Sequence, residues 1–193
     1  MKKKSYFAHE TVFIDKNVII GKNSKIWHFS HIQSNSAIGE NCSLGQNVNI
    51  SNNVIIGNNV KIQNNVSVYE GVELEDYVFC GPSAVFTNVY KPRSEFPQNE
   101  SELYQKTLVK KSASVGANAT ILCGITIGKY ALIGAGSVVL DDIPDFALIV
   151  GNPGKIIGWV DKKGDRLDFR TNGKSICENF YFDGTTVSLL EDH

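Results

Sequence analysis

The sequence lacks a long apolar run and an excess of charge of either sign. No stretch approaches the roughly 20 apolar residues that crossing a bilayer requires, and the formal net charge is −1. Nucleic-acid binding depends on clustered positive charge, so no nucleic-acid partner is expected. The three lysines that follow Met1 precede no apolar stretch, unlike a secretory signal. We therefore expect a cytoplasmic protein that does not insert into membranes.

Closely spaced cysteines and abundant histidines are also missing. The four cysteines form no CxxC pair, which argues against zinc, redox and disulfide motifs and favours reduced thiols. A metal-dependent enzyme of the carbonic anhydrase kind needs three well-placed histidines, and the four in this chain do not have that spacing: His9, His28, His31 and His193. No metal is expected.

What the sequence does contain is a repeat with a period of six residues. The period fits neither a helix nor an alternating strand. Nineteen positions follow it, and 17 of them are Ile, Leu or Val: Ile14, Ile20, Ile26, Ile32, Ile38, Leu44, Ile50, Ile56, Ile62, Val68, Leu74, Cys80 and Phe86, then Val109, Val115, Ile121, Ile127, Ile133 and Val139.

Asn or Gly stands three residues after these positions in 12 of the 19 cases, as at Asn17, Asn47 and Gly136. Both residue types tolerate positive φ, which a tight turn requires. Each hexapeptide therefore predicts a short strand and a turn, and three hexapeptides close a triangular coil of 18 residues. The coils stack as parallel strands, and each needs its neighbours to bury its inner face. The pattern predicts an all-β parallel β-helix without fixing its handedness.

The repeat also predicts the domain organisation. It covers residues 8–87 and 109–143, and a loop over 88–108 with two prolines separates the two runs. Long loops in compact repeats are often functional. We assign residues 1–158 to the β-helix and residues 159–193 to a C-terminal extension that caps the open end.

Stacking with a period of 18 places residues in vertical columns. One polar column contains His28, Gln46 and Asn64, and Tyr69 belongs to another. A third column places Glu70 one coil below Asn88, at the root of the loop. Because polar columns beside an extruded loop predict a binding site, we expect His28, Gln46, Asn64 and Tyr69 to contact the substrate, although such residues also solvate the flat faces of β-helices.

Three segments sharpen this interpretation: Leu44–Val48, Lys61–Tyr69 and Val78–Arg93. With the repeat, they resemble the hexapeptide-repeat acetyltransferases, whose β-helix is left-handed. They are most similar to the bacterial N-acetyltransferases that act on UDP-2-acetamido-3-amino-2,3-dideoxy-glucuronate, a precursor of lipopolysaccharide O-antigen. Enzymes for dTDP-3-amino-3,6-dideoxyhexoses share much of the pattern.

The resemblance implies a homotrimer with each site between neighbouring subunits. The nucleotide-linked sugar would lie near the first coils and the loop, and acetyl-CoA along the second run of coils. Implied acetyl-CoA contacts are Asn118, Ala135 and Gly136, then Asn152, Pro153 and Lys155 of a segment that resembles a GxPA[KR] element with Gly154 in place of Ala. That segment would alternatively serve only to end the helix.

Many relatives use a loop histidine as general base, but here Asn88 stands in that region. An amide takes up no proton at neutral pH, but it can position an amine or a thioester oxygen. We therefore expect direct attack of a neutral sugar amine on the thioester, with Asn88 positioning the amine and Glu70 supporting it. The alternative is His28 or His31 as the base, supplied by a neighbouring subunit.

Loop cations complete the expected site. Arg93 is a candidate partner for a carboxylate or diphosphate of the substrate, Lys91 is a weaker one, and both are equally compatible with a solvated loop. O-acetylation of a sugar or serine is a less favoured function, because an alcohol needs a strong base. A non-catalytic scaffold is the third possibility.

Overall fold

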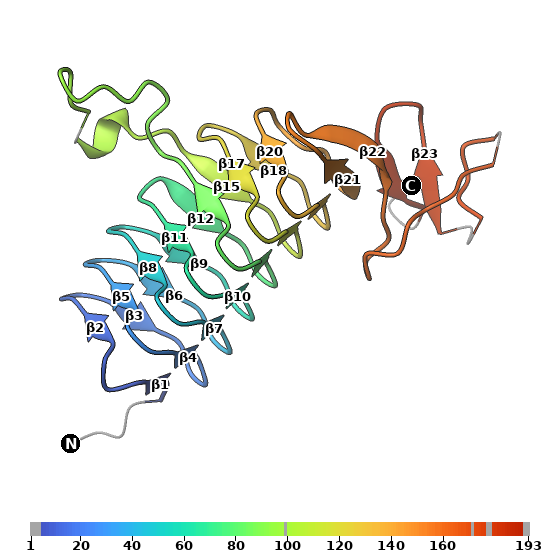
Figure 1. Ribbon diagram of the computed structural model, residues 1–193. Coiled ribbons are helices and arrows are strands. Elements are labelled where there is room, and N and C mark those ends of the chain that lie inside the picture. Colours follow the sequence, from blue (N-terminus) through green and yellow to red (C-terminus); the bar gives the residue numbers. More distant parts are fainter. Residues whose placement is uncertain (1–4, 99, 171, 177–178, 191–193) are drawn as a thin grey trace.

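The computed structural model describes residues 5–98, 100–170, 172–176 and 179–190. The chain forms a left-handed parallel β-helix, as the resemblance implies, and the coils stack into a triangular prism with three sheets as its faces. The loop after β14 projects away from the prism, and a small C-terminal unit lies at the end opposite the N-terminus (Figure 1).

Each of the first six coils contributes one short strand to each face, and the chain beyond them adds strands to faces 1 and 2. Face 1 contains β1 (Phe7–Ala8), β4 (Lys25–Ile26), β7 (Ser43–Leu44), β10 (Lys61–Ile62), β13 (Phe79–Cys80), β16 (Ser114–Val115), β19 (Leu132–Ile133), β21 (Ala147–Val150) and β22 (Lys155–Trp159). Face 2 contains β2 (Phe13–Ile14), β5 (His31–Ile32), β8 (Asn49–Ile50), β11 (Ser67–Val68), β14 (Val85–Phe86), β17 (Thr120–Ile121) and β20 (Val138–Val139). Face 3 contains β3 (Ile19–Ile20), β6 (Ala37–Ile38), β9 (Ile55–Ile56), β12 (Val72–Leu74), β15 (Thr107–Val109) and β18 (Thr126–Ile127). We name the edges of the prism by the faces they join, as the 1–2, 2–3 and 3–1 edges.

The predicted aliphatic ladder forms the core of the prism. Every ladder position from Ile26 to Val139 is at most 2% exposed, including the two positions that break the aliphatic rule, Cys80 and Phe86. Ile14 and Ile20, in the first coil, are partly exposed because no coil covers them from below. The register also follows the prediction, since Ile62 pairs with Leu44 below and Cys80 above, each 18 residues away.

The turns confirm the predicted positive φ and extend it to unexpected residue types. All 12 of the predicted Asn and Gly positions have positive φ. Six other turn residues of the described chain adopt it as well: Phe29, Tyr77, Ser83, Ser112, Tyr130 and Phe146. The expectation that the turn demands Asn or Gly was therefore too strict. The stacked coils above and below fix the backbone, and their pairing outweighs the 1–2 kcal/mol or so that a left-handed residue with a Cβ costs.

Glycine is distributed unevenly over the three edges. At four positions on the 1–2 edge and four on the 3–1 edge, an added Cβ would come within 3.0 Å of the backbone of the next coil: Gly45, Gly81, Gly116, Gly134, and Gly21, Gly39, Gly57, Gly128. The equivalent positions on the 2–3 edge all carry side chains: Asp15, Gln33, Ser51, Tyr69, Thr87, Leu122 and Leu140. The 2–3 edge thus has room for side-chain chemistry, and the loop emerges from this edge.

Buried serine hydroxyls link successive coils. Ser30 Oγ donates to Gly45 O (3.0 Å) and accepts from the backbone N–H of Val48 (3.1 Å). Ser137 occupies the equivalent place near the C-terminal end and is fully buried, but its hydroxyl has no hydrogen-bond partner. The chain above it leaves the hexapeptide register after β21, so it does not present the donor and carbonyl that Ser30 meets.

Alanine substitutions at these two serines are expected to have opposite effects on stability. Ser30→Ala should lower the free energy of unfolding by about 1–3 kcal/mol, because it leaves buried backbone groups unpaired. Ser137→Ala should leave it unchanged or raise it, since it removes an unpaired buried hydroxyl. Urea unfolding of both variants measures the difference, and equal losses would contradict this account.

The chain that follows the last coil packs on the C-terminal end of the prism. Strand β22 turns back antiparallel to β21, and a hairpin of β23 (Phe180–Phe182) and β24 (Val187–Leu189) follows. Aromatic rings join the two parts, with Phe146 stacked on Tyr130 (centroids 5.1 Å apart) and in edge contact with Phe180 (5.3 Å). The extension therefore covers apolar side chains at the C-terminal end of the prism.

Candidate functional site

The root of the loop brings together the two residues predicted to act in catalysis. Asn88 lies one coil above Glu70, and its Nδ2 donates to the main-chain oxygen of Glu70 (3.3 Å). The backbone N–H of Gln105 donates to Asn88 O (2.9 Å) and closes the base of the loop. Asn88 and Glu70 are both partly buried. The predicted vertical neighbourhood is therefore present, and the loop is anchored at Asn88.

The Glu70 carboxylate has a partner that the sequence did not indicate. Asn53 Nδ2 donates to Glu70 Oε1 (2.8 Å) from the coil below. Asn53 is one of the left-handed turn residues, with φ of 59°, and the sequence explains it fully as a turn former. The turn nevertheless projects its amide toward the carboxylate, so Asn53 fixes the direction in which Glu70 points.

The neighbouring positions on the 2–3 edge are ordered by the stacking. Thr87 Oγ1 accepts from the backbone N–H of Cys123 (2.9 Å), which ties the start of the loop to the coil above it. Tyr69, one coil below Thr87, is 41% exposed. Its ring is free to contact a bound molecule at this edge.

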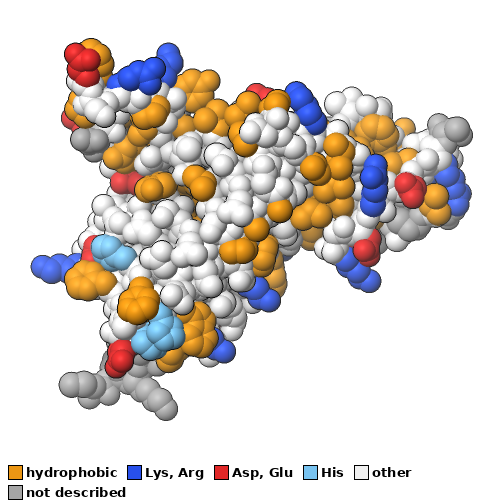
Figure 2. All heavy atoms as spheres, viewed as in Figure 1, with side chains coloured by type: hydrophobic (Ala, Val, Ile, Leu, Met, Phe, Trp, Pro, Cys, Tyr) orange, Lys and Arg blue, Asp and Glu red, His pale blue; other side chains and the backbone are white. Residues whose placement is uncertain are grey.

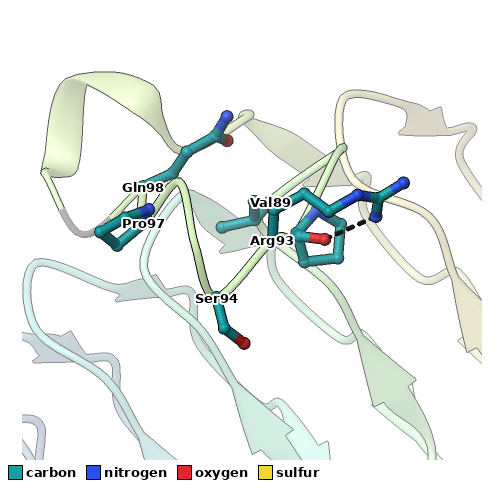
Figure 3. A pocket seen from close by; sticks show the side chains of 6 residues that line it. Val89, Arg93, Ser94, Pro97 and Gln98 are labelled. Atoms are coloured by element: carbon teal, nitrogen blue, oxygen red, sulfur yellow. Dashed lines mark hydrogen bonds between the residues drawn. The ribbon is translucent and has the colours of Figure 1, made fainter.

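The loop itself carries the predicted cations on its surface. It continues through a 3₁₀ turn, η1 (Ser101–Leu103), before it returns to β15. Arg93 is exposed and donates from Nη1 to the adjacent Pro92 O (2.7 Å), the dashed bond in Figure 3. Val89, Ser94, Pro97 and Gln98 surround it and line an open hollow of about 450 Å³. Lys91 is also exposed, so both cations are available to an anionic ligand.

Three other predicted substrate contacts lie on a different edge. His28, Gln46 and Asn64 stack in the predicted order on the 1–2 edge, whereas Asn88 is on the 2–3 edge. Asn64 Oδ1 accepts the backbone N–H of Gln46 (2.9 Å), and the His28 ring stacks on His9 (centroids 3.6 Å apart). One chain alone therefore does not bring these residues to Asn88, because face 2 separates the two edges.

The predicted acetyl-CoA contacts form a column on the 1–2 edge in the last coils. Asn118 donates its backbone N–H to Pro82 O (3.0 Å), and Gly136 donates to Ala117 O (2.8 Å). Ala135 is exposed beside them. Open space surrounds Gly136, because a Cβ at this position would meet no atom within 4 Å.

The last segment of this column follows the final coil. The Asn152–Pro153 peptide bond is cis, and the backbone N–H of Gly154 donates to Val138 O (2.7 Å). Asn152, Pro153 and Lys155 are exposed. The six predicted acetyl-CoA contacts therefore all belong to the 1–2 edge of the last coils or to the segment that follows them, and their role stays a prediction.

The histidines that could serve as the base lie far from Asn88 within one chain. His31 belongs to β5, three coils below β14 on face 2, which is roughly 14 Å along the axis at the usual strand spacing. Its Nε2 lies 3.0 Å from Asp15 Oδ1. His28 is also in the second coil, and His193 lies outside the described residues. A histidine base at Asn88 would have to come from another subunit.

Two buried thiols are unsuited to act as nucleophiles. Burial raises the pKa of Cys80 to about 12, and burial also raises the pKa of Cys42. Both thiols therefore stay protonated at neutral pH, and the thiolate is the reactive form.

Within the described ranges, no three His, Cys, Asp or Glu side chains gather in a way that would hold a metal ion. The same part of the chain has no helix with the length and apolar character that a bilayer span requires.

Two family profiles match the repeats. The profile described as bacterial transferase hexapeptide (six repeats) matches residues 10–52, and the hexapeptide repeat of succinyl-transferase matches residues 37–70 and 113–141. These ranges include Glu70, Asn118, Ala135 and Gly136, and they exclude Asn88 and the loop.

Curated relatives match over less than half of their length. The chain is 45% identical over 93 residues to dTDP-3-amino-3,6-dideoxy-alpha-D-galactopyranose 3-N-acetyltransferase of Aneurinibacillus thermoaerophilus, covering 46% of this chain and 48% of that protein. It is 38% identical over 86 residues to 2,3,4,5-tetrahydropyridine-2,6-dicarboxylate N-acetyltransferase of Clostridium perfringens, covering 45% of this chain and 33% of that protein.

Solved structures share the fold. A variant of GDP-perosamine N-acetyl transferase from Caulobacter crescentus, in complex with CoA and GDP-perosamine, superposes with a TM-score of 0.52 at 22% identity, covering 80% of this chain and 58% of that one. A galactoside acetyltransferase in complex with coenzyme A gives a TM-score of 0.55 at 25% identity, covering 65% of this chain and 66% of the other.

Proposed function

Because the chain belongs to the hexapeptide-repeat family, we propose that it is an N-acetyltransferase that transfers the acetyl group of acetyl-CoA to the amino group of a nucleotide-linked sugar. The observation that carries the proposal is the loop root, where the amide of Asn88 and the carboxylate of Glu70 stand on adjacent coils. The similarity to a dTDP-3-amino sugar N-acetyltransferase supports the same activity.

The active assembly in this proposal is a homotrimer with its sites between subunits. One chain displays Asn88 on the 2–3 edge and the acetyl-CoA column on the 1–2 edge. Two edges of one rigid prism cannot approach each other, whereas edges of neighbouring prisms can. A trimer would therefore unite the two halves of the site.

The proposal places the enzyme in the cytoplasm, where the free thiols of Cys42, Cys80 and Cys123 stay reduced.

The chemistry needs no base at the loop root. A sugar amine that is desolvated at the loop root favours its neutral form. Its nitrogen lone pair attacks the thioester carbonyl, a C–N bond forms, and a backbone N–H on a coil stabilises the oxyanion. The C–S bond then breaks, and the departing CoA thiolate takes the extra proton from the new amide nitrogen. Asn88 holds the amine in line for attack, and Asn53 keeps the Glu70 carboxylate directed beside it.

Two nucleotide sugars are the leading acceptors. The sequence segments around the loop favour UDP-2-acetamido-3-amino-2,3-dideoxy-glucuronate, whose carboxylate suits Arg93, and this acceptor would place the enzyme in O-antigen sugar synthesis. The 45% identical relative favours a dTDP-3-amino-3,6-dideoxyhexose. Its chemistry at the loop root would be the same, because the reacting amine is at C3 in both.

A panel of acceptors tests the function. Purified full-length protein is mixed with acetyl-CoA and UDP- or dTDP-linked 3-amino sugars, and thiol release is followed together with the product mass. We expect one 3-amino sugar to gain a single acetyl group, and a 3-hydroxy analogue to gain none. Acetylation of the hydroxy analogue would indicate an O-acetyltransferase. Absence of thiol release with every acceptor would overturn the proposal and favour a scaffold.

A further inference from the structure

Three positions in the first coil are structurally equivalent, one on each face of the prism. Phe7, Phe13 and Ile19 each stand directly before an inward-pointing residue of β1, β2 or β3. They are 45%, 66% and 69% exposed. Because their backbone positions are equivalent, a difference in the neighbouring side chains indicates a difference in what each residue can bind.

The ring of Phe13 contacts a titratable side chain. The His31 ring stands edge-on to Phe13, with centroids 5.3 Å apart and planes at 76°. His31 is in turn held by Asp15, whose Oδ1 lies 3.0 Å from Nε2, and Asp15 Oδ2 accepts from Ser34 Oγ (3.4 Å). By contrast, Phe7 packs on Trp27. Phe13 is therefore an exposed ring held beside a fixed imidazole and a carboxylate.

Face 2 runs from Phe13 and His31 to the loop root. Between Phe13 and Asn88 its outward side chains are mostly polar, and several are linked: Gln33 Nε2 donates to Asn49 Oδ1 (3.1 Å), and Asn49 Nδ2 donates to Ser51 Oγ (3.4 Å). The 2–3 edge beside this face is apolar beyond the loop, where Leu122 and Leu140 follow β17 and β20. The linked polar side chains of Gln33, Asn49 and Ser51 therefore lie between His31 and the loop root.

The spacing suits the two ends of one elongated ligand. Phe13 and the loop root are four coils apart, which is roughly 19 Å along the axis, and His31 lies one coil nearer to the root. A diphosphate and a ribose separate the base from the reacting sugar in a nucleotide-linked sugar, so the molecule is long and has a flat aromatic ring at the end away from the amine. Figure 2 shows histidine and hydrophobic side chains gathered at the N-terminal end of the molecule.

We propose that Phe13, His31 and Asp15 form the nucleoside-binding end of the acceptor site, with the base stacked on the exposed face of Phe13. This inference rests on the proposed function, because it takes the acceptor to be a nucleotide-linked sugar. His31 fixes the edge of the Phe13 ring, and Asp15 fixes His31. Carboxylates also accept hydrogen bonds from ribose hydroxyls, as in dinucleotide sites, so Asp15 is placed to contact the sugar of the nucleoside.

Binding of free UDP and free dTDP to the full-length protein tests this site without relying on catalysis. Calorimetry should show that Phe13→Ala and Phe13→Leu each weaken binding of the preferred nucleotide by about 10-fold or more, since an aromatic platform contributes about 1–3 kcal/mol per base. Phe13→Trp, which keeps a ring, should bind within about threefold of wild type. The matched variants Phe7→Ala and Ile19→Ala should bind like wild type.

The results separate this inference from the proposed function. If wild type acetylates a nucleotide sugar while Phe13→Ala binds the free nucleotide as tightly as wild type, the nucleoside site is wrong and the function stands. If no acceptor is acetylated but Phe13→Ala still selectively weakens nucleotide binding, the site stands and the function is wrong. Equal losses in all three alanine variants, or a change of oligomeric mass in Phe13→Ala alone, would assign Phe13 to folding or subunit contact and overturn the inference.

Discussion

Replacing Asn88 by alanine is expected to lower kcat/KM for the preferred amino sugar by about 100-fold, the usual loss when a positioned polar group leaves a transition state. The fold should survive, because the Asn88 side chain is partly exposed and makes one long hydrogen bond, to Glu70 O. Steady-state kinetics with acetyl-CoA measures the loss, and urea unfolding checks that stability is unchanged.

Asn52→Ala is the matched control for Asn88. Asn52 lies two coils below Asn88 in the same column, is exposed and takes no part in the proposed chemistry, so its removal should leave kcat/KM within about twofold of wild type. Full activity in the Asn88 variant would remove Asn88 from the mechanism. In that case, a flat pH–rate profile in His28→Ala, against a bell-shaped profile in wild type, would assign the base to a histidine from the neighbouring subunit.

Gly116→Ala is expected to reduce the free energy of unfolding by at least about 3 kcal/mol or to prevent folding. A Cβ on Gly116 would lie 2.5 Å from Ala135 N and 2.7 Å from Ile133 O. Backbone cannot retreat as a flexible side chain does, because Gly116 N–H itself donates to Ile133 O (2.8 Å) and holds the coils at their spacing. The added methyl group would therefore break the stacking of two coils.

Gly136→Ala is the control that distinguishes the steric overlap expected at Gly116 from the strain of a left-handed backbone. Gly136 has φ of 69°, but a Cβ there meets nothing within 4 Å. This variant should lose only about 1–2 kcal/mol, the cost of a Cβ in the left-handed region. Urea unfolding in the absence of CoA compares the two variants, and a similar loss in both would show that the close approach of the coils is not what excludes alanine at Gly116.

The core and the register followed from the sequence because the period alone determines them. Once Ile62 is placed inward, Leu44 and Cys80 must lie below and above it, whatever their chemistry. The neighbourhood of Glu70 and Asn88 could be predicted for the same reason. A repeat converts distance along the chain into height along the axis, so vertical relations are the most predictable part of this fold.

Contacts that depend on side-chain direction were not predictable. Asn53 has the composition of a turn former, and nothing in the pattern indicates that its amide reaches Glu70. The left-handed conformation of Phe29 and Tyr130 is imposed by neighbouring coils rather than by the residues themselves. Phe146 and Phe180 lie in segments that do not share the six-residue period, so the repeat does not predict their contact.

The division of the candidate site between two edges was also missed within a single chain. Columns give height but not which corner of the triangle faces another subunit. His28, Gln46 and Asn64 were therefore grouped with Asn88 although face 2 separates them. Residues that differ by six along the repeat lie on different faces or edges, and this rule separates the column of His28 from the column of Asn88.

The loop leaves and re-enters the prism without altering the strand pairing around it. Leu74 pairs with Ile56 below and with Val109 above, although the second partner lies beyond the whole insertion. The strand pairing of the prism therefore does not depend on the length or composition of the segment inserted at the 2–3 edge. Under the proposed function, exchange of this one segment would change the loop side of the acceptor site and leave the coils intact, and the same junction offers protein engineers a position for grafting foreign recognition loops.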